Sequence, residues 1–531
     1  MTAASPMDRA AGVLVPLFSI PSSSSWGIGE IADLPVLASW LREARVSVVQ
    51  LLPVNEMAAG ETSPYSAISA MAIDPIFISL RDVGDFQACG GEARLPLAAQ
   101  AALRSARGAG RVDHAAVRHA KDAALQLAFS MFWETEWIRG TARAGAFATY
   151  CVFEEWWLAD YALYRALRDR YAARSWTDWD APLRNREPGA LDDARRELER
   201  EVLYYQYLQW IAEEQWQDAR AASAPVRVFG DFPFMVSTDS ADVWARQDLF
   251  RFDRTVGVPP DAFSATGQEW GLPVYRWDRM AEQGDGWLKQ RSRRSARLYD
   301  GYRIDHLVGF YRTYSRPLGE QEGAFDPVDE AEQLAQGERL MDLFIASGAR
   351  IIAEDLGSVP EFVRESLTRL GLPGYKVVRW EREWDTPGQP FRDPVAYPAL
   401  AVGTTGTHDT DPNATWWEQA PPEERQAFAE LAAVRGALAG AAPADAPFTP
   451  ALRDAILALL YRSPASLLLI PLQDVFGWTD RINTPGTVAA DNWCWKLPWR
   501  VDALAVEPVA AERAAFLKAL AAETGRFPAK T

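Results

Sequence analysis

The stretch "YDGYRIDHL" (residues 299–307) decides the fold of this chain. Its aromatic and aliphatic residues suit a buried β-strand, yet it ends with Arg303, Asp305 and His306. Charged groups in such a place are costly to desolvate unless they pair with one another or meet a ligand. A short buried strand that ends in polar groups is typical of a parallel sheet with a functional site at its strand ends.

Seven other stretches share this short apolar pattern, and amphipathic helical patterns stand between several of them, at 34–44, 329–347 and 360–370. These candidate strands are "GVLVPL" (12–17), "VSVVQLLP" (46–53), "VRVFGDFP" (226–233), "RIIAEDL" (350–356), "GYKVVRWE" (374–381), "VGTTGTHD" (402–409) and "ASLLLIPLQD" (465–474). Eight strands alternating with helices predict the α/β fold class and a closed (β/α)8 TIM barrel. An open, doubly wound sheet is the alternative architecture.

The segment between the second and third candidate strands is too long for a single connection. Residues 81–222 have mostly helical patterns, such as "ELEREVLYYQYLQWIAEEQW" (197–216). We therefore expect one catalytic barrel over residues 1–531, with a helical insertion subdomain at 81–222. The helical stretch "AAERAAFLKALAAET" (510–524) follows the eighth strand, so we expect no C-terminal β-sandwich domain.

The charge and cysteine content exclude several classes of function. The formal net charge of -17 argues against nucleic acid and anionic membranes as partners, because both require a basic face. No uncharged apolar run approaches the roughly 20 residues that span a bilayer. The cysteines Cys89, Cys151 and Cys494 lie far apart without a C-x-x-C motif, which predicts a reducing, cytoplasmic setting.

Three candidate strands end in an acid at the same relative position: Asp305, Glu354 and Asp409. A single strand-end acid could simply cap a helix or accept turn hydrogen bonds. Three of them at the mouth of one barrel indicate chemistry. The two-residue period of a strand places Arg303 and Asp305 on one face, where the guanidinium keeps the carboxylate ionised.

Glu354 differs from Asp305 in its surroundings, because it follows the apolar residues Ile351 to Ala353, which favour a protonated carboxyl group. An ionised and a protonated carboxyl group side by side are the equipment for cleaving a glycosidic bond. Tryptophan is also enriched, at 22 of 531 residues, and indole rings pack well against sugar rings, although a Trp-rich helical core accounts for most of them.

Two of the four histidines, His306 and His408, adjoin Asp305 and Asp409. Neutral imidazoles beside a carboxylate cluster can bind hydroxyl groups. A metal site is the alternative, but the chain has no H-x-x-x-H or similar ligand spacing to support one. We therefore expect neither a metal nor a cofactor.

Several further motifs extend along nearly the whole chain in a fixed order. They are "GIGEIADL" (27–34), "SPYSAISAMAIDPIFI" (63–78), "GDFPFMVSTDSADVWA" (230–245), "VGVPPDAFSATGQEWGLPVYRWD" (256–278), "RIDHLVGF" (303–310), "AEDLG" (353–357), "GTHDTD" (406–411), "PLQDVFG" (471–477) and "RINTPGT" (481–487). With these motifs in this order, the sequence closely resembles the amylomaltase family, the 4-α-glucanotransferases related to the α-amylase clan.

The resemblance implies a reaction and a set of site residues. Asp305 would be the nucleophile, Glu354 the acid/base and Asp409 the transition-state stabiliser in a retaining transfer between malto-oligosaccharides or other 1,4-α-glucans. The implied substrate contacts are Tyr65, Arg303, His306 and His408 around the cleaved sugar, Asp261, Gln268 and Trp270 in an active-site loop at 257–272 beside the acceptor, and Asn483 as a further pocket contact.

Some positions depart from the family's pattern. Thr410 follows Asp409 where the family often has Asn, and Ala262 follows "PPD" where the family often has an aromatic residue. These differences concern acceptor preference and loop closure and leave the three carboxylates in place. Two other functions fit the same residues: a hydrolytic α-glucanase of the clan, and an inactive carbohydrate-binding relic.

Overall fold

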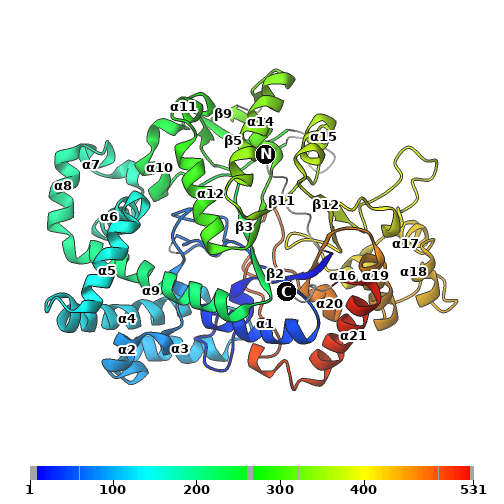
Figure 1. Cartoon of the computed structure of the whole chain (residues 1–531), viewed down its shortest axis with the longest axis horizontal. Helices are drawn as coiled ribbons and strands as arrows, with labels where there is room; N and C mark the ends of the chain where they lie inside the picture. The colour runs from blue at the N-terminus through cyan, green and yellow to red at the C-terminus, as the bar shows by residue number, and fades with distance from the viewer. Residues whose placement is uncertain (1–8, 59, 260–266, 321, 488, 527–531) are drawn as a thin grey trace.

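Eight parallel strands close into a barrel in the computed structural model, which describes residues 9–58, 60–259, 267–320, 322–487 and 489–526 (Figure 1). Every strand pairs with its neighbours in chain order, and β1 pairs with β14 to close the ring. The barrel strands are β1 (Ala10–Leu14), β2 (Val48–Gln50), β3 (Arg227–Phe232), β8 (Gly301–Ile304), β11 (Arg350–Ala353), β12 (Gly374–Val377), β13 (Ala401–Thr404) and β14 (Leu467–Pro471). The predicted (β/α)8 barrel is confirmed, and the open sheet is wrong.

The observed strands are shorter than the apolar runs that predicted them. The first ends at Leu14, before Pro16, because proline has no N–H group to donate to a neighbouring strand. Asp305 and Glu354 come directly after the last residues of β8 and β11. Asp409 follows β13 only after the residues 405–408, so the expectation of one common relative position for the three acids is wrong.

Apolar side chains fill the inside of the barrel, so it is a packed core and not a pore. The strands contribute a small cluster that is separate from the surrounding core: Ala10, Val48, Phe229, Ile352, Tyr375, Val402, Leu467 and Leu469. Because the barrel interior is packed in this way, space for a ligand at the barrel itself lies at the ends of its strands.

Helices alternate with the barrel strands along the chain, as the βα pattern predicts. They are α1 (Leu34–Glu43), α10 (Ala241–Ala245), α11 (Trp277–Glu282), α12 (Gly286–Leu298), α13 (Val308–Tyr311), α14 (Glu330–Ile345), α15 (Glu361–Leu370), α16 (Asn413–Gln419), α17 (Pro422–Phe428), α18 (Ala432–Ala437), α19 (Pro450–Arg462), α20 (Leu472–Phe476) and α21 (Pro508–Thr524). The helices predicted at 34–44, 329–347 and 360–370 correspond to α1, α14 and α15.

Between β2 and β3 the chain forms a group of helices that lies to the left of the barrel in Figure 1. These helices are α2 (Gly84–Ala88), α3 (Leu97–Gly108), α4 (His114–Phe132), α5 (Ala142–Phe153), α6 (Glu155–Arg170), α7 (Ala181–Arg184), α8 (Pro188–Glu197) and α9 (Glu199–Ser223). Aromatic rings hold them together: Phe132 on α4 meets Phe147 on α5 at 5.3 Å and Tyr207 on α9 at 5.0 Å.

A second, smaller sheet stands beside the barrel, in the order β10-β9-β5-β6, with the two-stranded sheet β4-β7 next to it in the chain. Its strands are β5 (Arg254–Val258), β6 (Gln268–Glu269), β9 (Thr313–Pro317) and β10 (Ala324–Asp326), and the two-stranded sheet contains β4 (Phe250–Arg251) and β7 (Val274–Tyr275). The strands β5 and β6 pair antiparallel, Gly257 with Glu269 and Val258 with Gln268, within the 257–272 segment, and this pair is called the β5–β6 hairpin below.

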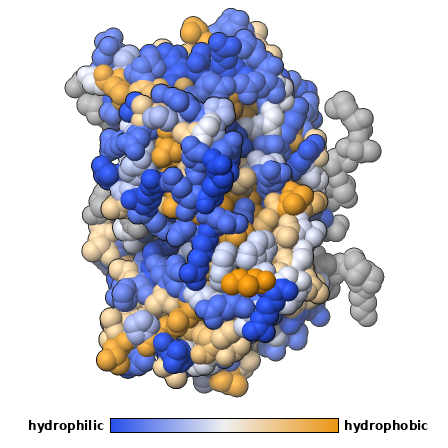
Figure 2. Space-filling model, turned by 90° about the vertical axis from the view of Figure 1, so that its left-hand side faces the viewer, coloured by the Kyte–Doolittle hydropathy of each residue, from blue (hydrophilic) through white to orange (hydrophobic). Residues whose placement is uncertain are grey.

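On the face of the molecule shown in Figure 2, hydrophilic residues cover most of the upper part, while hydrophobic residues lie among them and gather toward the lower edge. Exposed apolar side chains are common on protein surfaces. Among the residues that the structure describes, no helix is both long and apolar enough to cross a lipid bilayer.

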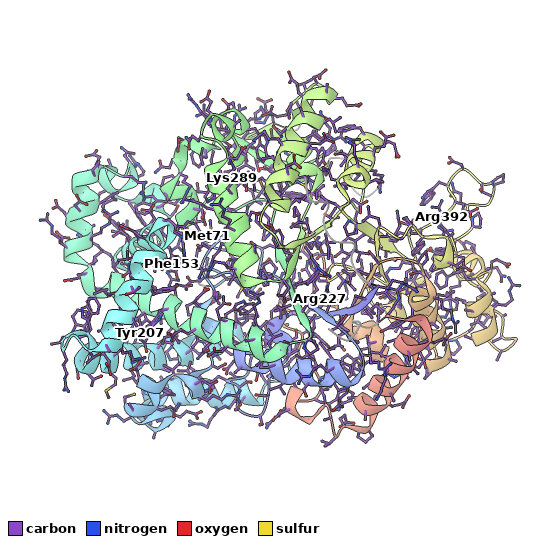
Figure 3. The ribbon with its side chains drawn as sticks, viewed as in Figure 1. Met71, Phe153, Tyr207, Arg227, Lys289 and Arg392 are labelled. Atoms are coloured by element: carbon purple, nitrogen blue, oxygen red, sulfur yellow. The ribbon has the colours of Figure 1, made fainter. Side chains whose placement is uncertain are left out.

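A buried ion pair connects the helical region to the barrel. Arg294 on α12 contacts the Glu213 carboxylate on α9 at 2.5 Å. It also donates a hydrogen bond to the Met71 carbonyl at 2.9 Å. Figure 3 labels Met71, and Tyr207 on α9. Burial raises the pKa of Glu213. Arg294 and Arg297 lower it by more than burial raises it, so the net pKa lies below the ordinary value. The carboxylate is therefore charged and depends on its arginine partners.

We expect Arg294→Met to destabilise the protein by about 3–5 kcal/mol, because it leaves the Glu213 charge buried beside a weaker, partly exposed partner. Urea unfolding followed by tryptophan fluorescence measures the loss. The double variant Arg294→Met/Glu213→Leu removes both charges and should recover most of it. Equal destabilisation of the single and double variants would contradict a role for the ion pair.

Candidate active site

Asp305 and Glu354 lie side by side at the mouth of the barrel. The last paired residues of their strands, Ile304 and Ala353, are in register, so the next residue of each strand faces the same opening. The backbone N–H of Glu354 donates to the Ile304 carbonyl at 3.1 Å, and that of Asp305 donates to the Phe232 carbonyl on β3 at 3.0 Å. Both carboxyl groups are thus fixed by the barrel itself.

The buried Arg303 guanidinium contacts two carboxyl groups of the site. Its Nη1 contacts both carboxylate oxygens of Asp231, at 2.9 and 2.7 Å, and its Nη2 lies 2.7 Å from Asp305 Oδ1. Although burial lowers the pKa of Arg303, Asp231 and Asp305 raise it well above the ordinary value. This arrangement confirms that Arg303 and Asp305 share a face, and the 2.7 Å contact fixes the orientation of the Asp305 carboxyl group.

Glu354 is set for proton transfer near neutral pH. It accepts hydrogen bonds from the backbone N–H of His306 at 2.8 Å and of Leu356 at 3.0 Å. Burial and the nearby Asp305 carboxylate raise its pKa to about 7, against the lowering effect of Arg303. A carboxyl group with a pKa near the working pH can donate a proton and later take one back.

The pKa of Asp409 is shifted in the opposite direction from that of Glu354. Asn483 Nδ2 donates to its Oδ1 at 2.7 Å, and the His408 ring lies 3.2 Å from its Oδ2. Burial raises the pKa of Asp409, but His408 and the Asn483 hydrogen bond lower it to about 2. With 39% of its side chain exposed, Asp409 presents a permanent negative charge to the opening.

His408 belongs to a stack of rings that lines the same opening. Its Nε2 lies 3.1 Å from the Tyr65 hydroxyl, which donates to Asp231 Oδ2 at 2.9 Å. The Tyr65 and His408 rings are stacked at 5.4 Å, and Trp493 packs against both at 5.8 Å. Burial lowers the pKa of His408, but Asp409 raises it, and the net pKa lies above the ordinary value.

His306 fits the neutral description. Its backbone has a left-handed φ of 44°, which few residues other than glycine adopt. The chain therefore leaves the extended conformation of β8 at this residue. Trp270 meets this ring edge-on at 4.9 Å, and Phe234 lies at 5.6 Å. Burial lowers the pKa of His306 to about 4, so the imidazole is uncharged at neutral pH and able to hydrogen-bond a hydroxyl group.

The structure describes two of the three residues expected in the 257–272 loop. Gln268 stands on β6, and its Oε1 accepts from Trp270 Nε1 at 3.3 Å. Trp270 connects this hairpin to the site through its contact with His306. Asp261 lies outside the described residues.

Asp231 and Trp493 were not among the residues predicted for the site. Asp231 lies inside the candidate strand "VRVFGDFP", and an acid within an apolar strand is the same signal that identified "RIDH". The position of Trp493 at the site depends on a contact with helix α4, which is distant in the sequence. Its carbonyl lies 2.9 Å from Nε2 of His114 on α4, 379 positions away in the chain, which no local pattern can reveal.

The donor set suits hydroxyl groups better than a metal. Within the described ranges, no three or more His, Cys, Asp or Glu side chains are grouped as ligands of a metal ion. The site instead combines an ionised carboxylate, a carboxyl group with a pKa near 7 and two imidazoles beside aromatic rings. This set can cut and form bonds to sugar rings.

Comparisons with known proteins agree with this chemistry. A sequence model of the 4-alpha-glucanotransferase family matches residues 15–502. The 4-alpha-glucanotransferase of Thermus thermophilus is 34% identical over 508 residues, covering 92% of this chain and 95% of the relative. The enzyme of the same name from Chlamydia pneumoniae is 31% identical over 510 residues, covering 93% of this chain and 92% of the relative.

Solved structures share the fold over almost the whole chain. Amylomaltase from Streptococcus agalactiae, in complex with acarbose, has a TM-score of 0.81 and 26% identity, and covers 98% of this chain and 100% of its own. Amylomaltase from Corynebacterium glutamicum also has a TM-score of 0.81, at 22% identity, with 96% of this chain and 75% of its own covered. From the match to the family model and the identity to these relatives, this chain belongs to the 4-alpha-glucanotransferase family, the amylomaltases.

Proposed function

We propose that this enzyme moves a 1,4-α-glucan segment from a donor malto-oligosaccharide to the 4-hydroxyl group of an acceptor glucan or glucose, with retention of configuration. The observation that carries the proposal is the pair Asp305 and Glu354 on adjacent strand ends, one paired with Arg303 and the other with a pKa of about 7. A retaining mechanism requires one carboxylate as nucleophile and one carboxyl group as proton donor.

In the first step, Asp305 Oδ attacks the anomeric carbon while Glu354 gives its proton to the departing glycosidic oxygen. The bond from the anomeric carbon to that oxygen breaks, and an ester bond to Asp305 forms. In the second step, the ionised Glu354 takes the proton of the acceptor 4-hydroxyl group, whose oxygen displaces Asp305. The enzyme returns to its starting protonation state.

The remaining site residues have supporting roles in this proposal. Asp409, with its pKa of about 2, stabilises the positive charge that develops on the sugar ring in both transition states. Tyr65, Arg303, His306 and His408 contact the sugar at the cleavage point. Asn483 keeps Asp409 oriented through its 2.7 Å hydrogen bond.

Transfer instead of hydrolysis requires that a sugar reaches the covalent intermediate before water does. We assign this task to the 257–272 loop with Asp261, Gln268 and Trp270, since Trp270 contacts His306 at the site. A hydrolytic α-glucanase uses the same carboxylates, so the products of maltotriose distinguish the two functions. Transfer gives glucose and chains longer than maltotriose, whereas hydrolysis gives only glucose and maltose.

We propose that residues 81–222 form a subdomain that supports the catalytic mouth. The contacts of the 109–114 segment with the 491–496 segment support this role, since the Val112 N–H donates to the Cys494 carbonyl at 2.8 Å and His114 Nε2 lies 2.9 Å from the Trp493 carbonyl. The free cysteines Cys89, Cys151 and Cys494 support a reducing, cytoplasmic location.

Asp305→Asn should reduce transfer from maltotriose by about three orders of magnitude or more, because the amide cannot form the covalent intermediate. Chromatography of the products over time measures the loss. Asp192→Asn, at an exposed acid on α8 paired with Arg195, is the matched control and should keep full activity. Substantial transfer by a sequence-verified Asp305→Asn protein would rule out the assignment of the nucleophile.

The pH profile should report Glu354. Its folded pKa is raised to about 7, so the proton that the first step needs is present below that pH and is lost as the pH rises through it. We therefore expect kcat/KM for maltotriose to fall tenfold per pH unit above about pH 7. Initial rates at low substrate from about pH 5 to about pH 9 measure the profile. A flat profile up to about pH 9 would contradict the role of Glu354 as the acid.

Asp231→Asn should lower kcat by about 10²-fold, because Arg303 loses the charge that fixes it and Asp305 loses its orientation. Maltotriose kinetics and thermal unfolding of the same preparation separate the loss of activity from a loss of fold. Asp300→Asn, at an acid before β8 that pairs with Arg220 at 2.7 Å, serves as a comparison at a distance from the sugar. Unchanged kcat in Asp231→Asn would show that Arg303 needs no such anchor.

A further inference from the structure

A second pocket lies at the base of the β5–β6 hairpin, in the part of the chain that the structure describes. Its volume is about 1030 Å³, which reaches the upper end of the range for small-molecule sites. Its walls come from the residues before β5 (250–253), from the residues after the hairpin (275–278), and from α14. None of the residues proposed for the catalytic site lines it.

The charges around this pocket are mixed. Arg251, Arg276 and Arg339 face four carboxylates, among them Asp278 and Glu332. A phosphate or another anion would lie against the carboxylates, and a cation would lie against the guanidinium groups. A neutral ligand rich in hydroxyl groups avoids both costs, because it accepts from guanidinium groups and donates to carboxylates.

Arg276 is an arginine of this pocket whose guanidinium is free to bind a ligand. Its side chain is half-buried, and its guanidinium forms no ion pair or hydrogen bond with the described residues. By contrast, Arg251 pairs with Asp253 and Arg339 pairs with Asp285. The Arg276 donors can therefore bind ligand hydroxyl groups without breaking an existing contact.

An aromatic surface completes the pocket. Phe252 is 40% exposed at its edge, while Phe250, Tyr275 and Trp277 are buried behind it. The Phe252 ring has an edge contact with Trp176 at 6.0 Å. An exposed ring beside hydrogen-bonding groups fits a sugar, whose C–H faces are apolar and whose rim carries hydroxyl groups.

From these features we propose that this pocket is a second, non-catalytic binding site for a neutral oligosaccharide, in which Phe252 stacks on a sugar ring and Arg276 binds its hydroxyl groups. The identity of that oligosaccharide as a 1,4-α-glucan rests on the proposed function. The site would hold a distant part of the same long glucan, or a second one, while transfer proceeds at Asp305.

The position of the pocket connects it to the catalytic hairpin. The residues on either side of the hairpin line the pocket, and the hairpin is fixed by hydrogen bonds from the Trp270 N–H to the Val256 carbonyl and from the Val256 N–H to the Leu272 carbonyl, both at 3.0 Å. A bound sugar would therefore contact both ends of the segment that presents Trp270 to His306. Binding at one site and at the other are then energetically coupled.

The test uses the Asp305→Asn protein, which binds glucan without turning it over. Isothermal titration with maltoheptaose should give two sites per chain. Adding Phe252→Ala and Arg276→Ala should leave one site, whereas adding Arg195→Ala, at an exposed arginine on α8, should leave two. One site in the Asp305→Asn protein, or two sites after both pocket substitutions, would overturn the proposal.

Kinetics of the otherwise unmodified enzyme separate this proposal from the proposed function. Phe252→Ala/Arg276→Ala should transfer from maltotriose at the normal rate, but its KM for long amylose should rise by at least about fivefold. Arg276→Ala alone breaks no contact within the described structure and serves as the milder variant, with a smaller rise in KM. An unchanged KM for amylose in both variants contradicts the second site, whereas failure of the unmodified enzyme to transfer from maltotriose contradicts the proposed function.

Discussion

The site depends on one buried cation, the Arg303 guanidinium, held between Asp231 and Asp305. Buried charges are tolerated only when their partners are well placed, and both partners here are fixed by neighbouring barrel strands. Through Asp231 the same guanidinium connects to Tyr65, and Tyr65 connects to His408 and so to Asp409. One arginine thus orders groups from three strand ends and one loop.

Glu354 and Asp409 show how the surroundings of similar side chains shift their pKa values in opposite directions. Glu354 is buried next to another carboxylate, which raises its pKa to about 7, while Asp409 lies beside His408 and Asn483, which lower its pKa to about 2. The rings of Tyr65, Trp493 and Trp270 add flat surfaces around these charges. Flat rings beside hydrogen-bonding groups suit neutral sugars, in keeping with the 4-alpha-glucanotransferase family to which the chain belongs.

Much of this arrangement was predictable from the sequence, because it follows from local periodicity. The eight apolar runs identified the barrel strands, and the two-residue period placed Arg303 and Asp305 on one face. Strand ends were less predictable, since the runs that identified the strands continue past the last strand residues Leu14, Ile304 and Ala353. Asp231 was visible in its strand but was not recognised, because its importance comes from Arg303 on the neighbouring strand. The Trp493 contact with His114 depends on residues brought together only by the fold.

The contact between the 109–114 and 491–496 segments sets a condition on when the ring stack of the site can form. Trp493, which packs against Tyr65 and His408, belongs to the last part of the chain to leave the ribosome, and its carbonyl meets a helix made much earlier. The ring stack of Tyr65, His408 and Trp493 is therefore complete only after the 491–496 segment has been made and has docked on the 109–114 segment.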